Sequence, residues 1–289
     1  MKIYPLQTGS VKVKKSQKRR KLGGMARVLM DNEWTEWLPI YSWLILHPEG
    51  NIIVDTGETA RTAESDYFPR WHPYYRYAVK MDVCREQEID RRLAQFGLVP
   101  ADIDKVILTH FHTDHAGGLY HFSESEIMVS MPDYEDARGI FGKLKGYLPQ
   151  HWQSWFNPTG IAFLNEEFAS FDRFLPVTND GSIRIVPTPG HTAGHISVIA
   201  DDGNEKIFLA GDTSYTQDLL LRGQPDGVSP DRDQSVDTLE RIMRFAESDP
   251  IVYLPSHDPE AAERLKNREV LNTSGKRRHV GRKFRVDLS

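Results

Sequence analysis

The chain has 289 residues, of which 39 % are hydrophobic and 27 % charged, with a mean hydropathy of −0.51 and a net charge of −5. This is the composition of a globular protein that can bury a substantial core, either as one large domain or as two small ones. The chain contains no apolar run long enough to span a bilayer, no apolar signal core near its start and only one cysteine, Cys84, so we expect a cytoplasmic protein without an internal disulfide.

Basic residues crowd two segments, despite the acidic net charge. A predicted strand at residues 2–6 leads into the first basic segment, 12–21, and the second occupies 276–285. Such segments can bind nucleic acid or an anionic surface, or they can be a solvated loop and tail. We prefer the second interpretation because no stacking aromatics are interleaved with the basic residues. Neither a nucleic-acid partner nor a membrane is therefore expected.

The next part of the chain combines regular patterns with an unusual aromatic stretch. Residues 41–46 and 51–54 predict two strands joined by a turn into a hairpin. Residues 65–83 are crowded with tyrosine, tryptophan, proline and phenylalanine in no regular period. This stretch is either a loop held on the core by its rings or a wall beside a substrate site, and the two roles are compatible. A helix is predicted over 85–97, ending at Gly97.

A histidine-rich motif follows a short buried strand that ends at Thr109. Side chains two apart in extended backbone project to the same side, so the first two histidines can converge on one point. Imidazole and carboxylate ligands suit a divalent ion such as Zn²⁺. A loop that is histidine-rich by chance would need no partners elsewhere in the chain. The candidate ligands of this motif are His110, His112, Asp114 and His115.

A second irregular stretch lies beyond the motif. Residues 126–130 predict a strand, and Pro132 can begin a short helix. Residues 142–174 then carry many aromatics without a clear period, and they form the other candidate wall of a substrate site. A packing role is expected for His151, because no second ligand lies at a useful spacing from it.

Three further candidate ligands each follow a predicted strand. His191 comes after residues 183–186, Asp212 after 207–210 and His257 after 251–254. The ends of separate strands can meet at one edge of a sheet, so these side chains can join the first motif. Helices are predicted at 234–248 and 260–266. Strands and helices recur from end to end without a repeat or linker, which favours a single domain over 1–289.

These residues resemble the metallo-β-lactamase superfamily, whose signature is His-x-His-x-Asp-His followed by a downstream His, Asp and His. The resemblance implies an α/β (α+β) fold, a four-layer αββα sandwich with a dinuclear metal site. Asp55, in an Asp-Thr-Gly that the family shares, would brace the site by hydrogen bonds. His195 is expected to be structural or to support a ligand. The resemblance implies that one ion is held by His110, His112 and His191, the other by Asp114, His115 and His257, and that Asp212 bridges both.

Within this superfamily, the Asp-x-x-Tyr of Asp212 and Tyr215 looks like the N-acyl homoserine lactonase branch. The implied activity is quorum quenching: a metal-bridging hydroxide opens the lactone ring of N-acyl homoserine lactones. Asp114 would transfer a proton, and Tyr215 would donate a hydrogen bond to the substrate carbonyl. Thr113 departs from the pattern, because many lactonases carry a large apolar residue there.

Several alternatives remain open from the residues alone. Another lactone, ester, thioester or lactam could be the substrate on the same fold, and a nucleic-acid-processing protein is the rival from another class. Two Zn²⁺ ions are the first expectation, while Fe, Mn and Co suit the same ligands. Exposed aromatics in the early loop would suit the contact of a homodimer.

Overall fold

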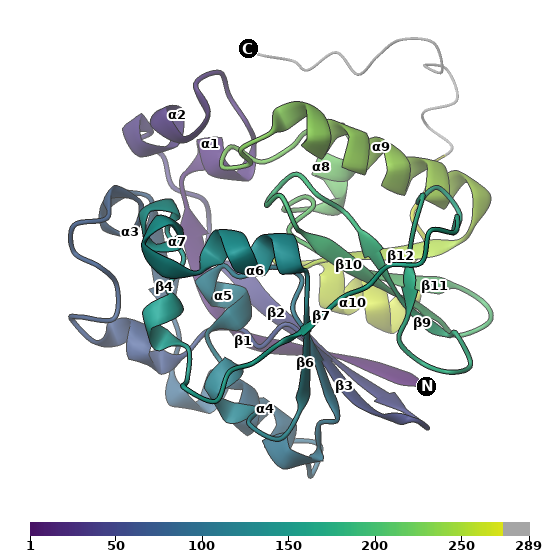
Figure 1. Cartoon of the computed structure of the whole chain (residues 1–289). Helices are drawn as coiled ribbons and strands as arrows, with labels where there is room; N and C mark the ends of the chain where they lie inside the picture. The colour runs from purple at the N-terminus through teal and green to yellow at the C-terminus, as the bar shows by residue number, and fades with distance from the viewer. Residues whose placement is uncertain (274–289) are drawn as a thin grey trace. The chain divides into compact units, whose positions relative to one another are not determined.

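The computed structural model describes residues 1–273, and the basic segment at 276–285 lies outside the described residues. The chain forms two compact units. The first comprises Met1–Lys14 and Asn32–Ala162, and the second comprises Lys15–Asp31 together with the chain from Phe163 onward (Figure 1). Organisation as a single domain stays a prediction. Among the described residues, no helix is both long and apolar enough to cross a membrane.

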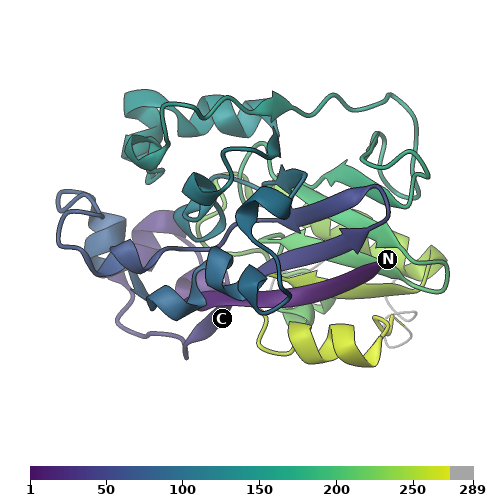
Figure 2. The ribbon, with the colours of Figure 1, turned by 90° about the horizontal axis from the view of Figure 1, so that it is seen from below.

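The first unit is built on a seven-stranded mixed sheet. The predicted hairpin is confirmed as β2 and β3, which pair antiparallel, and Figure 2 shows β1 beside them. The predicted first strand is longer than expected and includes part of the first basic segment. The strands are β1 (Lys2–Val13), β2 (Leu38–His47), β3 (Gly50–Val54), β4 (Val79–Asp82), β5 (Lys105–Ile107), β6 (Glu126–Val129) and β7 (Thr159–Gly160), in the order β4-β1-β2-β3-β5-β6-β7.

The register of this sheet brings two sequence motifs together. Strands β3 and β5 run parallel, with Val54 opposite Ile107. Their carboxyl ends therefore lie side by side. Asp55 directly follows β3, and the segment that leads to His110 follows β5. The backbone N–H of Asp55 donates to the carbonyl of Ile107 over 2.9 Å, which fixes this juxtaposition.

Helices of the first unit cover one face of its sheet. Ile89 and Leu93 of α4 and Leu119 of η4 pack in one cluster with strand residues such as Val106 and Ile127. The α-helices are α3 (Pro73–Tyr77), α4 (Ile89–Ala94), α5 (Thr113–Ala116), α6 (Met131–Ala137) and α7 (Gly139–Lys145), and the 3₁₀ helices are η1 (Ala60–Ala63), η2 (Arg85–Gln87), η3 (Pro100–Asp102), η4 (Leu119–His121) and η5 (Pro149–His151).

Two predictions for this unit were wrong. The helix expected over 85–97 is divided into η2 and α4, because Glu88 leaves the helical conformation (φ −59°, ψ 153°). Its buried carboxylate accepts the backbone N–H of Ala60 over 3.0 Å instead. The stretch 65–83, which showed no period, contains α3 and the strand β4, and β4 gains its regular structure by pairing with β1.

The second unit carries a five-stranded sheet in the order β12-β11-β10-β9-β8. The predicted strands are confirmed within a residue or two. Parallel pairing of β11 with β12 places Gly211 opposite Pro255, so Asp212 and His257 follow neighbouring strand ends. The strands are β8 (Leu175–Pro176), β9 (Ile183–Pro187), β10 (Ile196–Asp201), β11 (Lys206–Gly211) and β12 (Ile251–Pro255).

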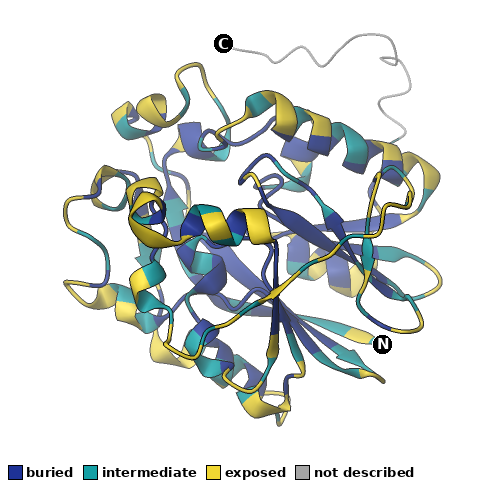
Figure 3. Cartoon of the chain, in the orientation of Figure 1, coloured by how far each residue is buried: buried dark blue, intermediate teal, exposed yellow. Residues whose placement is uncertain are grey.

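The long helix of the second unit packs its apolar stripe on this sheet. Leu239, Ile242 and Phe245 of α9 share a core cluster with Phe208 and Ile199 of the strands. The opposite face of α9 is exposed (Figure 3). Its N-cap is Asp231, whose carboxylate accepts the N–H of Gln234 over 3.0 Å. The helices are α1 (Lys15–Lys18), α2 (Gly24–Met30), α8 (Gln217–Leu221), α9 (Arg232–Ser248) and α10 (Ala261–Asn267).

Candidate metal centre

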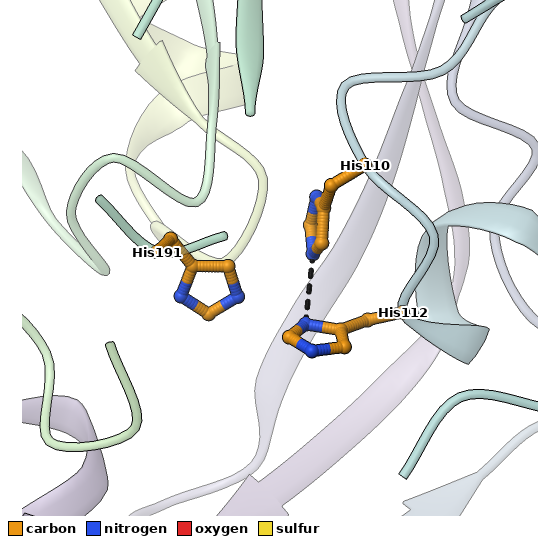
Figure 4. A group of neighbouring side chains, drawn as sticks. All are labelled: His110, His112 and His191. Carbon is orange, nitrogen blue, oxygen red and sulfur yellow. Dashed lines mark hydrogen bonds between the residues drawn. The ribbon is translucent and has the colours of Figure 1, made fainter. Parts of the chain in front are cut away.

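The first two histidines of the motif converge in the first unit. His110 Nε2 lies 2.9 Å from His112 Nδ1, as the dashed line in Figure 4 marks. Two nitrogen ligands of one tetrahedral Zn²⁺, each about 2.0–2.1 Å from the ion, are about 3.3 Å apart. The two imidazoles therefore present their nitrogen atoms at nearly the spacing that a shared ion requires. His110 is buried, and the hydroxyl of Thr109 lies 3.0 Å from its Nδ1.

The next two candidate ligands lie on the single turn of α5, and a buried carboxylate holds one of them. His115 Nε2 is 3.9 Å from Asp114 Oδ1. The other nitrogen of His115, Nδ1, is 2.8 Å from Asp55 Oδ2. Asp55 also accepts the backbone N–H of Thr109 over 2.8 Å. The predicted bracing role of Asp55 by hydrogen bonds is thus seen in the structure.

Asp55 reaches this position in an unusual backbone conformation. Its φ of +60° lies in the left-handed region, which costs free energy for a residue other than glycine. Such strain persists where the surroundings hold it. The hydrogen bonds of Asp55 with His115 and Thr109 stabilise this backbone conformation. They also direct His115 Nε2 away from Asp55.

Behind the motif, the backbone packs too closely for side chains. A Cβ on Gly117 would lie 2.3 Å from Glu58 Oε1, and one on Gly118 would lie 2.4 Å from the carbonyl oxygen of Thr56. Glu58 is fully buried and accepts the hydroxyl of Tyr67 over 2.9 Å. Burial, with the nearby charge of Asp114, raises the pKa of Glu58 to about 8. Burial therefore favours the neutral form of this carboxyl group.

In the second unit, one carboxylate oxygen lies between two imidazoles. Asp212 Oδ2 is 3.5 Å from His191 Nε2 and 3.4 Å from His257 Nε2. All three side chains are at least 95 % buried. One oxygen of the Asp212 carboxylate thus lies close to both candidate ligands of this unit.

Sequence reasoning did not single out the residue that holds His191. Asp226 Oδ2 lies 2.9 Å from His191 Nδ1. The same carboxylate accepts the N–H of Val228 over 2.8 Å and both the N–H and the hydroxyl of Ser229 over 2.7 and 2.6 Å. Burial alone would raise the pKa of Asp226, but His191 and the Ser229 donors outweigh it and lower that pKa below its usual range. The only local signal is a Pro-Asp-Gly turn.

Replacing Asp226 with Asn should weaken metal binding. The amide keeps the shape but loses the charge that orients His191 and raises its basicity, so we expect a loss of about 10- to 100-fold in metal affinity. Competition with a chromogenic chelator measures it. The control is Asp237→Asn, which alters an exposed carboxylate paired with Arg241. Equal affinities for the Asp226 variant and the parent protein would show that Asp226 does not support a ligand.

His195 occupies a supporting position. Its Nε2 accepts the backbone N–H of Asp212 over 3.0 Å, and its Nδ1 lies 2.9 Å from the hydroxyl of Thr188. Both ring nitrogens are thereby directed at the protein. These contacts agree with the structural role expected of His195, and they fix the backbone that presents Asp212.

Tyr215 is buried in the second unit against a candidate ligand. Its ring stacks on that of His257, with centroids 5.4 Å apart and an interplanar angle of 24°. Gln17 Nε2 donates a hydrogen bond to the phenol oxygen over 2.9 Å. Gln17 belongs to the first basic segment, and sequence reasoning gave it no role.

A pocket lies within the first unit beside the motif. It is a small, partly open hollow: about 430 Å³ of space lies within its outline, and this value includes open solvent. Thr113 and Gly117 of the motif line it, and His151 stacks on Tyr67 with ring centroids 4.3 Å apart. The packing role expected of His151 is seen. Both predicted substrate-facing stretches contribute: Tyr67 comes from 65–83, and Leu148, His151, Trp152, Gln153, Trp155 and Phe156 come from 142–174.

The donor set fits divalent metal ions in both units. Neutral imidazole and carboxylate are the ligands that zinc and other first-row metals take. His115 and His191 each place Nδ1 against a buried carboxylate, Asp55 or Asp226, so Nε2 is the ring nitrogen through which either histidine would bind an ion. This carboxylate–histidine arrangement is typical of metal ligands.

Comparison with known proteins agrees with this description. The family model described as "Metallo-beta-lactamase superfamily" matches residues 35–257. The N-acyl homoserine lactonase AttM of Rhizobium radiobacter is 27 % identical over 271 residues, covering 90 % of this chain and 94 % of its own. An N-acyl homoserine lactonase of a Bacillus species is 27 % identical over 228 residues, covering 77 % and 82 %.

The fold also matches solved structures. An N-acyl homoserine lactone hydrolase with N-hexanoyl-L-homoserine bound at its catalytic metal centre superposes with a TM-score of 0.73 at 21 % identity, covering 90 % of this chain and 94 % of that one. A mutant of AiiA from B. thuringiensis with bound N-decanoyl-L-homoserine gives the same TM-score and coverage.

The fold and the His/Asp clusters define a metal-dependent hydrolase. The chain belongs to the metallo-β-lactamase superfamily, and the predicted α/β fold class is confirmed. This fold implies binding of divalent metal ions through the histidine and aspartate residues at the strand ends. The assignment of individual ligands to individual ions stays a prediction.

Proposed function

We propose that the protein is a dinuclear hydrolase that opens the lactone ring of N-acyl homoserine lactones. The observation that carries the proposal is Tyr215, a buried phenol stacked on His257 three residues beyond Asp212. A phenol beside a metal ligand can donate to a carbonyl oxygen as negative charge develops on it. The names of the curated relatives support the same substrate class.

The proposed ligand set divides the seven side chains between two ions, with Zn²⁺ expected at both. Asp212 would be shared by the two ions. When bound, two such ions supply ionised water at neutral pH, because metal binding lowers the pKa of water from 15.7 to about 7. The first set is His110, His112 and His191, and the second is Asp114, His115 and His257.

Two side chains of this protein then perform the proton and charge transfers of ring opening. Asp114, whose side chain keeps 14 % of its exposure, accepts a proton from the attacking water. Tyr215 donates a hydrogen bond to the lactone carbonyl oxygen as the tetrahedral centre forms. The ring C–O bond breaks, Asp114 returns the proton to the departing ring oxygen, and the product is the open N-acyl homoserine.

The acyl tail is assigned to the pocket in the first unit. Its aromatic lining offers apolar area, and burial of each methylene contributes about 0.8 kcal/mol. Thr113 lines the pocket, and its small side chain, hydrogen-bonded to Tyr67 over 3.2 Å, leaves space that a large residue would fill. This supports a preference for long acyl chains.

Thr113→Phe should reverse that preference. The added ring would occupy the pocket, so we expect kcat/KM for a decanoyl lactone to fall at least tenfold relative to a butanoyl lactone, a loss of about 1–3 kcal/mol of binding. Thr113→Val is the control, because it removes the hydroxyl at nearly constant volume. A ratio of decanoyl to butanoyl turnover that is the same in all three proteins would exclude the pocket as the acyl site.

Side-by-side turnover tests the substrate class. Metal-quantified protein is offered an N-acyl homoserine lactone, a thioester and a labelled RNA. We expect the lactone to be opened with the highest kcat/KM. Faster turnover of the thioester would reassign the protein within the superfamily, and cleavage of RNA would give the basic segment 12–21 a role in recognition.

A further inference from the structure

The first basic segment contains a helix that is fastened to the loop carrying Asp226. The backbone N–H of Gly227 donates to the carbonyl of Gln17 over 2.7 Å, and that of Arg20 donates to the carbonyl of Pro225 over 3.0 Å. Arg19 Nε donates to Gln224 Oε1 over 2.6 Å. Residues 15–20 therefore lie along residues 224–227 within the second unit.

The approach of the two backbones is close enough to require glycine. A Cβ on Gly227 would lie 2.0 Å from the carbonyl oxygen of Ser16. At the other side, the N–H of Ser16 donates to Asp31 Oδ2 over 2.8 Å. The helix α1 is thus held from both sides, although it has only four residues.

The basic residues of the segment and Gln17 differ in their exposure to solvent. Lys15 is exposed and Lys18 half-buried, whereas Gln17 retains only 3 % of its exposure. The amide of Gln17 reaches a residue 198 positions away, donating to the phenol oxygen of Tyr215 over 2.9 Å. Tyr215 is itself only 3 % exposed.

The chemistry of the two groups sets the direction of this hydrogen bond. The amide nitrogen of glutamine carries two hydrogens and accepts nothing, whereas a phenol has one hydrogen and oxygen lone pairs. With the amide nitrogen facing the phenol, the phenol oxygen accepts from Gln17, and the hydrogen of the phenol points away from that amide. A phenol that accepts one hydrogen bond also donates a stronger one.

We propose that Gln17 is a positioning residue that fixes Tyr215 as a hydrogen-bond donor toward the substrate carbonyl. The proposal rests on the proposed lactone opening, because it specifies how Tyr215 is made ready for that reaction. Basic segment 12–21 thereby gains a role in catalysis that does not involve its charge.

Three substitutions at Gln17 separate hydrogen-bond direction from packing. At alkaline pH, Gln17→Glu presents only an acceptor and should capture the phenol hydrogen. We expect kcat and kcat/KM to fall together, by the factor that Tyr215→Phe costs, about 10- to 1000-fold. Gln17→Lys presents only donors and should stay within about threefold of the parent, and Gln17→Met should fall between them. A purely structural role predicts instead that both charged variants fail alike. Gln7→Glu, a half-buried glutamine of β1, is the charge-matched control.

Coupling and spectroscopy complete the test. In the Tyr215→Phe background, Gln17→Glu should have no further effect on kcat. In protein labelled with ¹³Cζ-tyrosine, Gln17→Glu should move the resonance that disappears in Tyr215→Phe and leave the other tyrosines in place. Unchanged kinetics in Gln17→Glu, additive losses in the double variant, or an unmoved resonance would each overturn the proposal. A parent protein that opens no lactone, but whose resonance moves, would refute the proposed function and leave the hydrogen-bond assignment standing.

Discussion

Replacing Asp212 with Asn is expected to remove metal from the protein and to lower hydrolysis by more than about a thousandfold. The oxygen Oδ2 lies within 3.5 Å of nitrogens of both His191 and His257, so a single carboxylate serves both imidazoles. An amide offers one neutral oxygen acceptor in place of an anion with two oxygens. Without the ions, water keeps its pKa of about 15.7 and the nucleophile is lost at neutral pH.

Elemental analysis and lactone turnover on the same sample measure this prediction. Asp218→Asn is a suitable control, because Asp218 is 61 % exposed and pairs only with Arg222 among the described residues. Circular dichroism of both variants verifies that the fold is kept. Retention of two ions per chain by the Asp212 variant would contradict a bridging role.

Replacing Tyr215 with Phe is expected to slow lactone opening by about 10- to 1000-fold while the metal content stays unchanged. The substitution removes the hydroxyl, which is both the proposed donor and the acceptor of the Gln17 amide, while the ring that stacks on His257 remains. One donor to a developing oxyanion is worth this much in other hydrolases. Because the bond forms fully only as charge develops, kcat should fall with kcat/KM.

Steady-state kinetics over a range of lactone concentrations provide the measurement. Tyr134→Phe, which alters a phenol packed against Phe111 and Trp152, controls for the loss of a hydroxyl elsewhere. A Tyr215 variant as fast as the parent would remove this residue from the mechanism. A rise in KM alone would mean that Tyr215 binds substrate and transition state equally.

The candidate ligands could be predicted because each follows a strand. Apolar runs such as 207–210 and 251–254 indicate buried strands. The residue type just beyond each run, histidine or aspartate, indicates a metal ligand. His191, Asp212 and His257 were found in this way, and the structure places Asp212 between the other two. The apolar period also predicted α9, and Phe245 is among the buried residues of that helix.

The supporting residues could not be found in the same way. Asp226 lies in an irregular loop, and Gln17 acts across 198 positions of the chain, so neither is marked by any period. Their roles depend on close contacts between segments that are distant in the sequence, such as that of Gly227 with Ser16. These contacts exist only in the folded chain. Strand β4 was not predicted for a similar reason, because its pairing with β1 is a long-range contact.

Measuring bound metal and lactone turnover together tests the central claim most directly. The protein is stripped with a chelator, Zn²⁺ is added stepwise, and bound metal and lactone turnover are measured on the same samples. We expect the stripped protein to be inactive and turnover to reach its plateau at two ions per chain. His110→Ala and His257→Ala, which change one candidate ligand from each unit, should each lower the number of ions bound. Full activity in a preparation free of metal would contradict the account.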